Sequence, residues 1–242
     1  MLRSLLRTLI GTVAVAGALL AYCWATTPDV RSLRTELPKT TAFMRLRADE
    51  AASAGKPLGF EQHVVRYSRI SPALVRAVLV AEDAAFFEHD GVDYNELKQT
   101  VEISFDKGIV ITRGASTITQ QLAKNLYLSP SRSPLRKVRE LLITRRLEAE
   151  LPKTRILELY LNLIEWGDGI WGAEAAAQEY FGVTASDLSA EQAALLAGAI
   201  INPRLHSPAH PTATLLRRQQ IILSRMERKT PPADKAPNSP HR

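Results

Sequence analysis

The sequence predicts a mainly α-helical protein with one N-terminal transmembrane helix. Helix-start signals recur along the chain beyond residue 70, whereas a strand-like pattern is confined to residues 63–67. The second observation is an uncharged segment from Thr8 to Pro28, close to the N-terminus. With 242 residues, the chain is long enough for one full-sized domain and few additions.

The segment from Thr8 to Pro28 is long enough to span a bilayer as a helix, which takes about 20 residues. Two arginines precede it and two aromatic residues lie near its far end. The positive-inside rule therefore places residues 1–7 in the cytoplasm and the rest of the chain outside it. A cleaved signal peptide is the alternative, but the apolar run is long for an h-region and the residues around Cys23 form a poor cleavage site. We expect an uncleaved, single-pass anchor.

The net charge of +6 and the pI near 9.6 favour anionic partners such as phospholipids, pyrophosphates or nucleic acid. With the body of the chain outside the cytoplasm, we expect no nucleic-acid partner. The single cysteine, Cys23, allows neither an intramolecular disulfide nor a CxxC metal cluster.

Beyond a membrane-proximal segment at residues 29–70, helix signals continue to residue 228. The expected helices cover residues 72–87, 94–105, 117–126, 134–151, 156–163, 174–181, 193–201 and 212–227. Five of them have an expected N-cap, namely Ser71, Asp93, Ser116, Ser133 and Ser189. A loop is expected at residues 106–113. Residues 229–242 contain four prolines and almost no apolar side chain, which predicts a disordered tail.

A carboxylate interrupts an apolar row on the first of these helices. Val75, Leu79, Glu82 and Phe86 follow one another by steps of four, three and four, so Glu82 shares a face with core residues. A half-buried carboxylate is costly unless it is paired or used. By itself, this segment is better explained by a surface Glu near a helix C-terminus, with His89 placed against the helix dipole.

Two further clusters carry polar and charged groups. In the segment from Gly114 to Asn125, Gln120 and Lys124 share a helix face, which suits a sugar beside a phosphate but also fits a capped helix. In the next cluster, Glu140 lies one helical turn beyond Arg136. An exposed pair of this kind contributes only a few tenths of a kcal/mol, but cations grouped near a helix N-terminus could neutralise a pyrophosphate.

Four segments resemble, in order, the four motifs of the family 51 peptidoglycan glycosyltransferases. Glu82 to Gly91 resembles EDxxFxxHxG, and Gly114 to Asn125 resembles GxSTITQQLxKN. Arg136 to Glu148 resembles RKxxExxxAxxLE, and Lys153 to Asn162 resembles KxxILExYLN. The resemblance covers roughly residues 71–226, and four long motifs in the family's order are a very specific signal.

The chain resembles the monofunctional branch of this family, because the segment from Ala175 to Gly182 extends the similarity toward that branch. We therefore expect no transpeptidase activity. Thr144 stands where the third motif usually has Ala, and Val183 replaces a frequent Lys. Neither position is expected to take part in the chemistry.

The resemblance implies a lysozyme-like, bilobal, mainly helical glycosyltransferase domain at residues 71–228. It implies that lipid II is joined to a growing lipid-linked glycan through a β-1,4 linkage, with inversion and release of undecaprenyl diphosphate. Because the acceptor hydroxyl must lose a proton, one base is required, and the leaving pyrophosphate requires cations rather than a second acid.

By motif position, Glu82 would be the general base, and Glu140 the second catalytic residue, orienting cations or the acceptor. The residues expected to bind substrate are Asp83, His89, Arg113, Ser116, Thr117, Gln120, Gln121, Lys124, Arg132, Arg136 and Lys137. A divalent cation such as Mg2+ is a candidate cofactor without assigned ligands, and no organic cofactor is expected.

The expected location is the bacterial inner membrane, with the catalytic domain in the periplasm. Expected partners are lipid II, the lipid-linked glycan and membrane lipid, with other wall-synthesis or division proteins as candidates. Two alternatives are a lysozyme-like lytic enzyme, which the basic residues near Glu140 disfavour, and a catalytically idle scaffold, which intact Glu82 and Glu140 disfavour.

Overall fold

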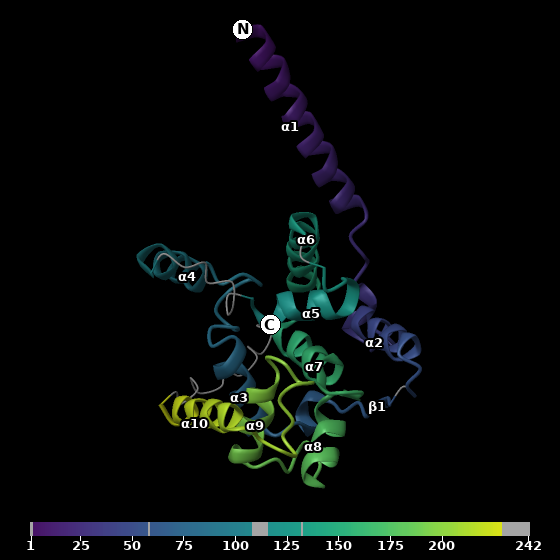
Figure 1. The fold of residues 1–242 in the computed structure, drawn as a ribbon, viewed down its shortest axis with the longest axis vertical. Coiled ribbons are helices and arrows are strands. Elements are labelled where there is room, and N and C mark those ends of the chain that lie inside the picture. The colour runs from purple at the N-terminus through teal and green to yellow at the C-terminus, as the bar shows by residue number, and fades with distance from the viewer. Residues whose placement is uncertain (1, 58, 108–115, 132, 229–242) are drawn as a thin grey trace, which may run out of the picture. The chain divides into compact units, whose positions relative to one another are not determined.

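The computed structural model describes residues 2–57, 59–107, 116–131 and 133–228. These residues form ten α-helices and three very short strands, which confirms the mainly α fold class (Figure 1). The chain divides into two compact units. The first unit comprises Met1–Phe60 and Ala85–Ile164, and the second unit comprises Glu61–Ala84 and Glu165–Arg242.

The first unit is helical throughout its described part. Its elements are α1 (Leu2–Ala25), the 3-10 helix η1 (Arg31–Arg34), α2 (Ala42–Ser53), α4 (Tyr94–Lys107), α5 (Ile118–Tyr127), α6 (Pro134–Glu150) and α7 (Lys153–Leu163). Helix α5 packs against α2, α6 and α7. Large side chains that are at most 1% exposed fill this core, namely Ile118, Leu122, Ile143, Leu147, Ile156, Leu157 and Tyr160. Their burial fixes α5, which carries the second motif.

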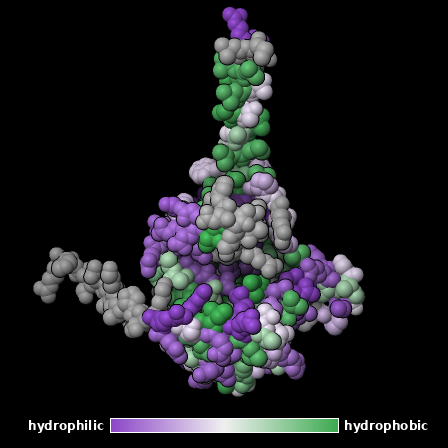
Figure 2. Space-filling model, turned by 60° about the vertical axis from the view of Figure 1, so that its left-hand side comes forward, coloured by the Kyte–Doolittle hydropathy of each residue, from purple (hydrophilic) through white to green (hydrophobic). Residues whose placement is uncertain are grey.

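Helix α1 is the one helix in the described part of the chain that is long and apolar enough to cross a membrane, over Leu5–Ala25. Most of its apolar side chains are exposed, and Figure 2 shows them as a continuous apolar surface over this helix. The helix ends at Ala25, so residues 26–28 of the expected anchor lie beyond it. Length and composition support a membrane span, although a signal sequence would share both properties.

Arginines of α6 and α7 bind the segment that follows α1. Arg146 donates to the carbonyl oxygens of Thr27 and Pro28 at 2.9 and 3.2 Å. Arg155 donates to the carbonyl oxygens of Leu33 and Glu36 at 2.8 and 2.9 Å. These hydrogen bonds therefore attach the segment that follows α1 to helices α6 and α7.

The second unit combines helices with a small sheet. Its elements are β1 (Glu61–Gln62), the 3-10 helix η2 (Tyr67–Arg69), α3 (Pro72–Glu82), β2 (Glu165–Gly167), β3 (Ile170–Trp171), α8 (Ala173–Phe181), α9 (Ala190–Ala199) and α10 (Ala213–Arg228). The strand order is β1-β3-β2, with β1 parallel and β2 antiparallel to β3. Helix α3 packs against α9 and α10. Burial raises the pKa of Tyr180 to about 12, and its hydroxyl donates to the Trp166 carbonyl at 3.3 Å.

Four of the five expected N-caps are confirmed. The side chains of Ser71, Asp93, Ser133 and Ser189 each accept a hydrogen bond from a backbone N–H in the first turn. The fifth was wrong by one residue: Thr117, not Ser116, caps α5, because its hydroxyl and the Gln120 side chain form a reciprocal capping box.

Two other expectations, the end of the first helix and the position of the strand, were wrong. Helix α3 ends at Glu82 instead of residue 87. The strand lies at Glu61–Gln62 instead of residues 63–67, because its register follows pairing with Ile170 and Trp171. The expected disordered tail at residues 229–242 lies outside the described residues, as does most of the expected loop at 106–113.

Candidate active site

The predicted base lies at the C-terminal end of α3 in the second unit. Glu82 is the last residue of this helix and is half-buried. Asp83 is only 3% exposed, and its N–H donates to the Leu79 carbonyl at 2.9 Å. At Asp83 the backbone leaves the helix and becomes extended, with φ −166°. Glu82 and Asp83 therefore lie at the C-terminus of α3, and no further helical turn follows them.

The predicted row that continued from Glu82 to Phe86 is wrong. Phe86 belongs to a turn in the first unit, where its side chain is 1% exposed. It packs edge-to-face against Phe87 and His89, at ring-centroid distances of 5.1 and 6.4 Å. Burial of this aromatic ring outweighs the gain from extending the helix by one turn, because a ring of this size removes a large apolar area from water.

The loop that begins at Phe86 ends at Gly91, which has φ +84°. The Gly91 N–H donates to Nδ1 of His89 at 3.1 Å, and its carbonyl accepts from the Thr117 hydroxyl at 2.7 Å. Nδ1 of His89 is therefore a hydrogen-bond acceptor within its own loop. This places one predicted substrate-binding residue, His89, on a loop that is hydrogen-bonded to another, Thr117.

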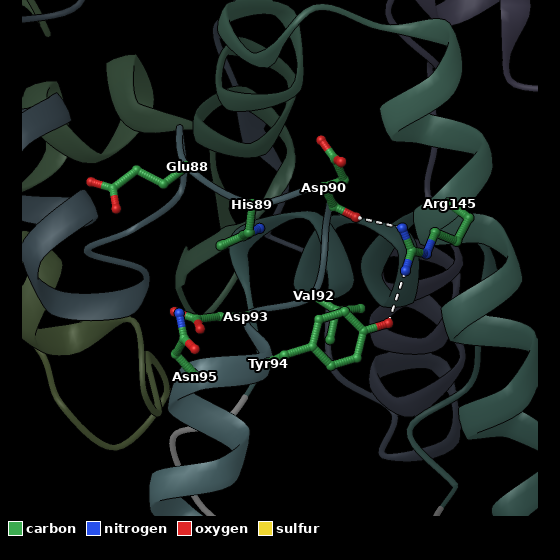
Figure 3. Close-up of a pocket in the computed structure, with 8 residues that line it drawn as sticks. All are labelled: Glu88, His89, Asp90, Val92, Asp93, Tyr94, Asn95 and Arg145. Atoms are coloured by element: carbon green, nitrogen blue, oxygen red, sulfur yellow. Dashed lines mark hydrogen bonds between the residues drawn. The ribbon is translucent and has the colours of Figure 1, made fainter.

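A small cavity of about 270 Å³ opens beside this loop in the first unit. Among the described residues, His89 is the one predicted site residue that lines it, together with Glu88, Asp90, Val92, Asp93, Tyr94, Asn95 and Arg145. Figure 3 shows Arg145 reaching from α6 to the Asp90 carbonyl and the Tyr94 hydroxyl, at 3.4 and 2.8 Å. The cavity's volume suits a single functional group better than a lipid-linked disaccharide.

Most polar groups at the start of α5 bind one another. Gln120 is 5% exposed, and its Oε1 accepts from the Thr117 N–H at 3.1 Å. Oε1 of Gln121 accepts from the Tyr160 hydroxyl at 2.9 Å, and its Nε2 donates to the Ser116 carbonyl at 3.3 Å. The side chain of Ser116 is exposed. In this arrangement the second motif shapes the start of α5, and Ser116 presents its hydroxyl to solvent.

Lys124 lies one turn beyond Gln120 on α5 and is half-buried. Its Nζ lies 5.6 Å from the centroid of the Phe43 ring on α2. A cation over an aromatic face is favourable and orients the ammonium without neutralising it.

Glu140 brings two of the predicted cations together at the start of α6. Its carboxylate is 3% exposed, with Oε2 bonded to Arg136 and Oε1 bonded to Lys137. The side chains of Arg136 and Lys137 are 19% and 50% exposed. A buried carboxylate between two cations leaves the cluster with one net positive charge, and it orients both cations. The predicted pairing of Glu140 with Arg136 is thus observed, and Lys137 joins it.

The Glu140→Gln substitution is expected to lower the rate of glycosyl transfer by roughly tenfold to a hundredfold, because the two cations lose the carboxylate that orients them. The thermal midpoint should also fall somewhat, because Arg136 is only 19% exposed and loses its carboxylate partner, so rates are compared per folded protein. The measurement is the initial rate of the purified full chain. Glu50→Gln, which breaks a pair with Arg47 on α2, is the matched control. Equal rates for all three proteins would contradict the orienting role.

Arg113 and Arg132, both predicted to bind substrate, lie outside the described residues. Within the described parts, no group of three or more His, Cys, Asp or Glu residues could hold a metal ion. The Glu140 carboxylate, one candidate ligand, is already bonded to two cations. These residues alone therefore do not form a metal site.

Glu148 and Lys153, two charged residues of the motifs, were not predicted as site residues, although they pair with each other in the structure. Glu148 accepts from the Thr119 hydroxyl and from Nζ of Lys153, at 2.5 and 2.8 Å. Their charges and motif positions were visible in the sequence, but a five-residue spacing across the break between two helices does not predict a pair. Only the chain's path between α6 and α7 reveals it.

Comparison with known proteins identifies the class and then the family. The sequence model described as "Transglycosylase" matches residues 53–227. The chain is 48% identical over 189 residues to the biosynthetic peptidoglycan transglycosylase of Laribacter hongkongensis, covering 78% of this chain and 82% of the relative. The protein of that name from Janthinobacterium sp. is also 48% identical over 189 residues, covering 78% and 81%.

A third relative of that name, from Aromatoleum aromaticum, is 50% identical over 167 residues, covering 69% of this chain and 72% of the relative. These matches define the chain as a glycosyltransferase. It belongs to the transglycosylase family, which confirms the resemblance that the four motifs indicated.

Proposed function

We propose that this enzyme is a peptidoglycan transglycosylase that joins lipid II to a growing lipid-linked glycan and releases undecaprenyl diphosphate. The names of the relatives support peptidoglycan as the product class. The observation that carries the proposal is the cluster of Glu140, Arg136 and Lys137, in which a buried carboxylate orients two cations at the start of α6. Cations at a helix N-terminus are suited to a pyrophosphate group.

In the proposed reaction Glu82 accepts the proton of the acceptor's 4-hydroxyl. The oxygen attacks the anomeric carbon of the donor from the face opposite the pyrophosphate, so the new β-1,4 bond forms with inversion. The bond from the anomeric carbon to the pyrophosphate oxygen breaks, and its electron pair leaves with the pyrophosphate. Arg136, Lys137 and Lys124 stabilise the negative charge that develops there.

The remaining predicted residues keep supporting roles in this proposal. Asp83 adjusts the charge beside the base, and His89 and Ser116 contact sugar groups. Thr117, Gln120 and Gln121 hold the start of α5 in place, and Arg113 and Arg132 add positive charge. A divalent cation would bind through phosphate oxygens of the substrate and at most one or two carboxylates, and the proposed steps require only the protein's own groups.

Attachment to the membrane fits lipid-linked substrates. Both donor and acceptor carry long lipid tails and stay at the bilayer surface, so an enzyme held there searches in two dimensions. We place α1 across the bacterial inner membrane with its N-terminus in the cytoplasm, because positive charges precede the apolar run. The catalytic units then face the periplasm, where membrane lipid and other wall-synthesis or division proteins are candidate partners.

The test is polymerisation of fluorescent lipid II by the purified full chain in detergent with Mg2+. The expected product is a ladder of glycan chains that lysozyme degrades. A lipid-free disaccharide pyrophosphate should give much less polymer. No polymer from this protein, in conditions where a known polymerase is active, would contradict the proposal. Release of fragments from purified sacculi would then identify a lytic enzyme, and no reaction with either substrate would support a scaffold.

A further inference from the structure

The loop that carries His89 also has contacts with residues that were not predicted as site residues. Three residues of the first unit form a network beside it, and they come from the second, third and fourth motifs. We refer to Lys153, Glu148 and Thr119 as the brace. Its centre is Oε1 of Glu148, which accepts from both the Thr119 hydroxyl and Nζ of Lys153, at 2.5 and 2.8 Å.

The brace is largely enclosed. Thr119 is fully buried, and the side chains of Glu148 and Lys153 are 8% and 20% exposed. A carboxylate with so little access to water requires its partners, because an uncompensated charge in this environment is costly. The Glu148–Lys153 pair is therefore unlike the exposed ion pair of Lys98 and Glu102 on α4, whose side chains are 77% and 60% exposed.

Lys153 contacts one end of the loop and Glu148 contacts the other. Nζ of Lys153 lies 4.4 Å from the centroid of the Phe86 ring, which is within the range of a cation–π interaction. A methyl group added at Gly91 would lie 2.9 Å from Cγ of Glu148. The two ends of the loop are thus held by one ion pair, with His89 between them.

We propose that Lys153 is a positioning residue that, through Glu148 and Phe86, holds the loop from Phe86 to Gly91 in the conformation needed for glycosyl transfer. The proposal rests on the proposed function, in which His89 contacts substrate. Lys153 itself does not touch the reacting atoms in this proposal.

The test compares Lys153→Met, which removes the charge and keeps the length, with Lys153→Arg, which keeps a cation. Lys153→Met should lower kcat by at least about tenfold, because a small displacement of a reacting group strongly lowers the rate. The KM for lipid II should change much less. Lys153→Arg should restore most of kcat. Lys98→Met, the same change at an exposed ion pair, is the control expected to keep full activity.

A second readout does not depend on activity. The Gly91 N–H donates to Nδ1 of His89, so the 15N signal of this nitrogen reports on the loop conformation in the folded full chain. The His89 signal, assigned with His89→Gln in detergent micelles, should move in Lys153→Met and return in Lys153→Arg. Glu148→Gln, which retains an acceptor for Thr119, should move it as Lys153→Met does.

The outcomes separate the two proposals. An unchanged His89 signal and full kcat in Lys153→Met would overturn the positioning role. So would a loss of kcat no larger than the unfolded fraction measured by circular dichroism. If Lys153→Met does not fold, an unchanged His89 signal in Glu148→Gln would overturn it. If the intact protein makes no polymer, the proposed function fails, whereas the His89 signal still tests whether Lys153 holds the loop.

Discussion

Replacing Glu82 by Gln is expected to lower the rate of lipid II polymerisation by at least about a hundredfold. The amide matches the carboxylate in size but cannot accept the proton of the attacking hydroxyl. Glu82 ends α3 and is half-buried, so the substitution removes no apolar core. The thermal midpoint of the full chain should therefore stay close to that of the unchanged protein.

The measurement is the initial rate with fluorescent lipid II, followed by lysozyme digestion of the product. Glu179→Gln is the matched control, because Glu179 is an exposed residue of α8 in the same unit. We expect polymer from the unchanged protein and the control only. Equal polymer from the Glu82 variant would remove Glu82 from the role of base and leave the enzyme's family unaffected.

Replacing Gly91 by Ala is expected to be the most destabilising of the proposed substitutions. Gly91 has φ +84°, and a Cβ there would lie 2.6 Å from Cγ2 of Thr144 and 2.9 Å from Cγ of Glu148. The left-handed backbone costs an L-residue roughly 1–2 kcal/mol, and overpacking adds roughly 1–3 kcal/mol. We expect a loss of about 2 to 5 kcal/mol in the free energy of unfolding.

Thermal unfolding of the full chain in detergent measures this effect, with Gly182→Ala as the control. Gly182 has φ +64° at the end of α8, but an added Cβ would meet no atom within 4 Å. The control should lose only the backbone contribution. Adding Thr144→Ala to Gly91→Ala should recover part of the loss, because it removes the Cγ2 contact. No recovery and equal losses at the two glycines would show that crowding at Gly91 is unimportant.

Thr144, a departure from the family pattern, makes a tertiary contact that its position in the sequence did not predict. The resemblance identified Thr144 at a position where Ala is usual, without a structural reason. In the structure its side chain is fully buried against Gly91, and its hydroxyl has no hydrogen-bond partner among the described residues. The contact involves the loop of the first motif, which lies more than 50 positions earlier in the chain.

Local patterns were sufficient for the helical fold class, the family and most helix starts. The caps at Ser133 and Ser189 were predicted correctly because each depends on backbone groups within three residues. The family was evident because the four motifs keep their order and spacing. The identities of Glu82 and Glu140 as candidate catalytic residues likewise came from motif positions.

Contacts between distant segments decided the rest. The end of α3 at Glu82 depends on the burial of Phe86, and the pairing of Lys153 with Glu148 depends on how α6 and α7 join. Such interactions form only after the chain brings separate helices together, so no periodicity within one helix encodes them. The sequence therefore indicated candidate site residues, and tertiary packing decided which partners hold them in place.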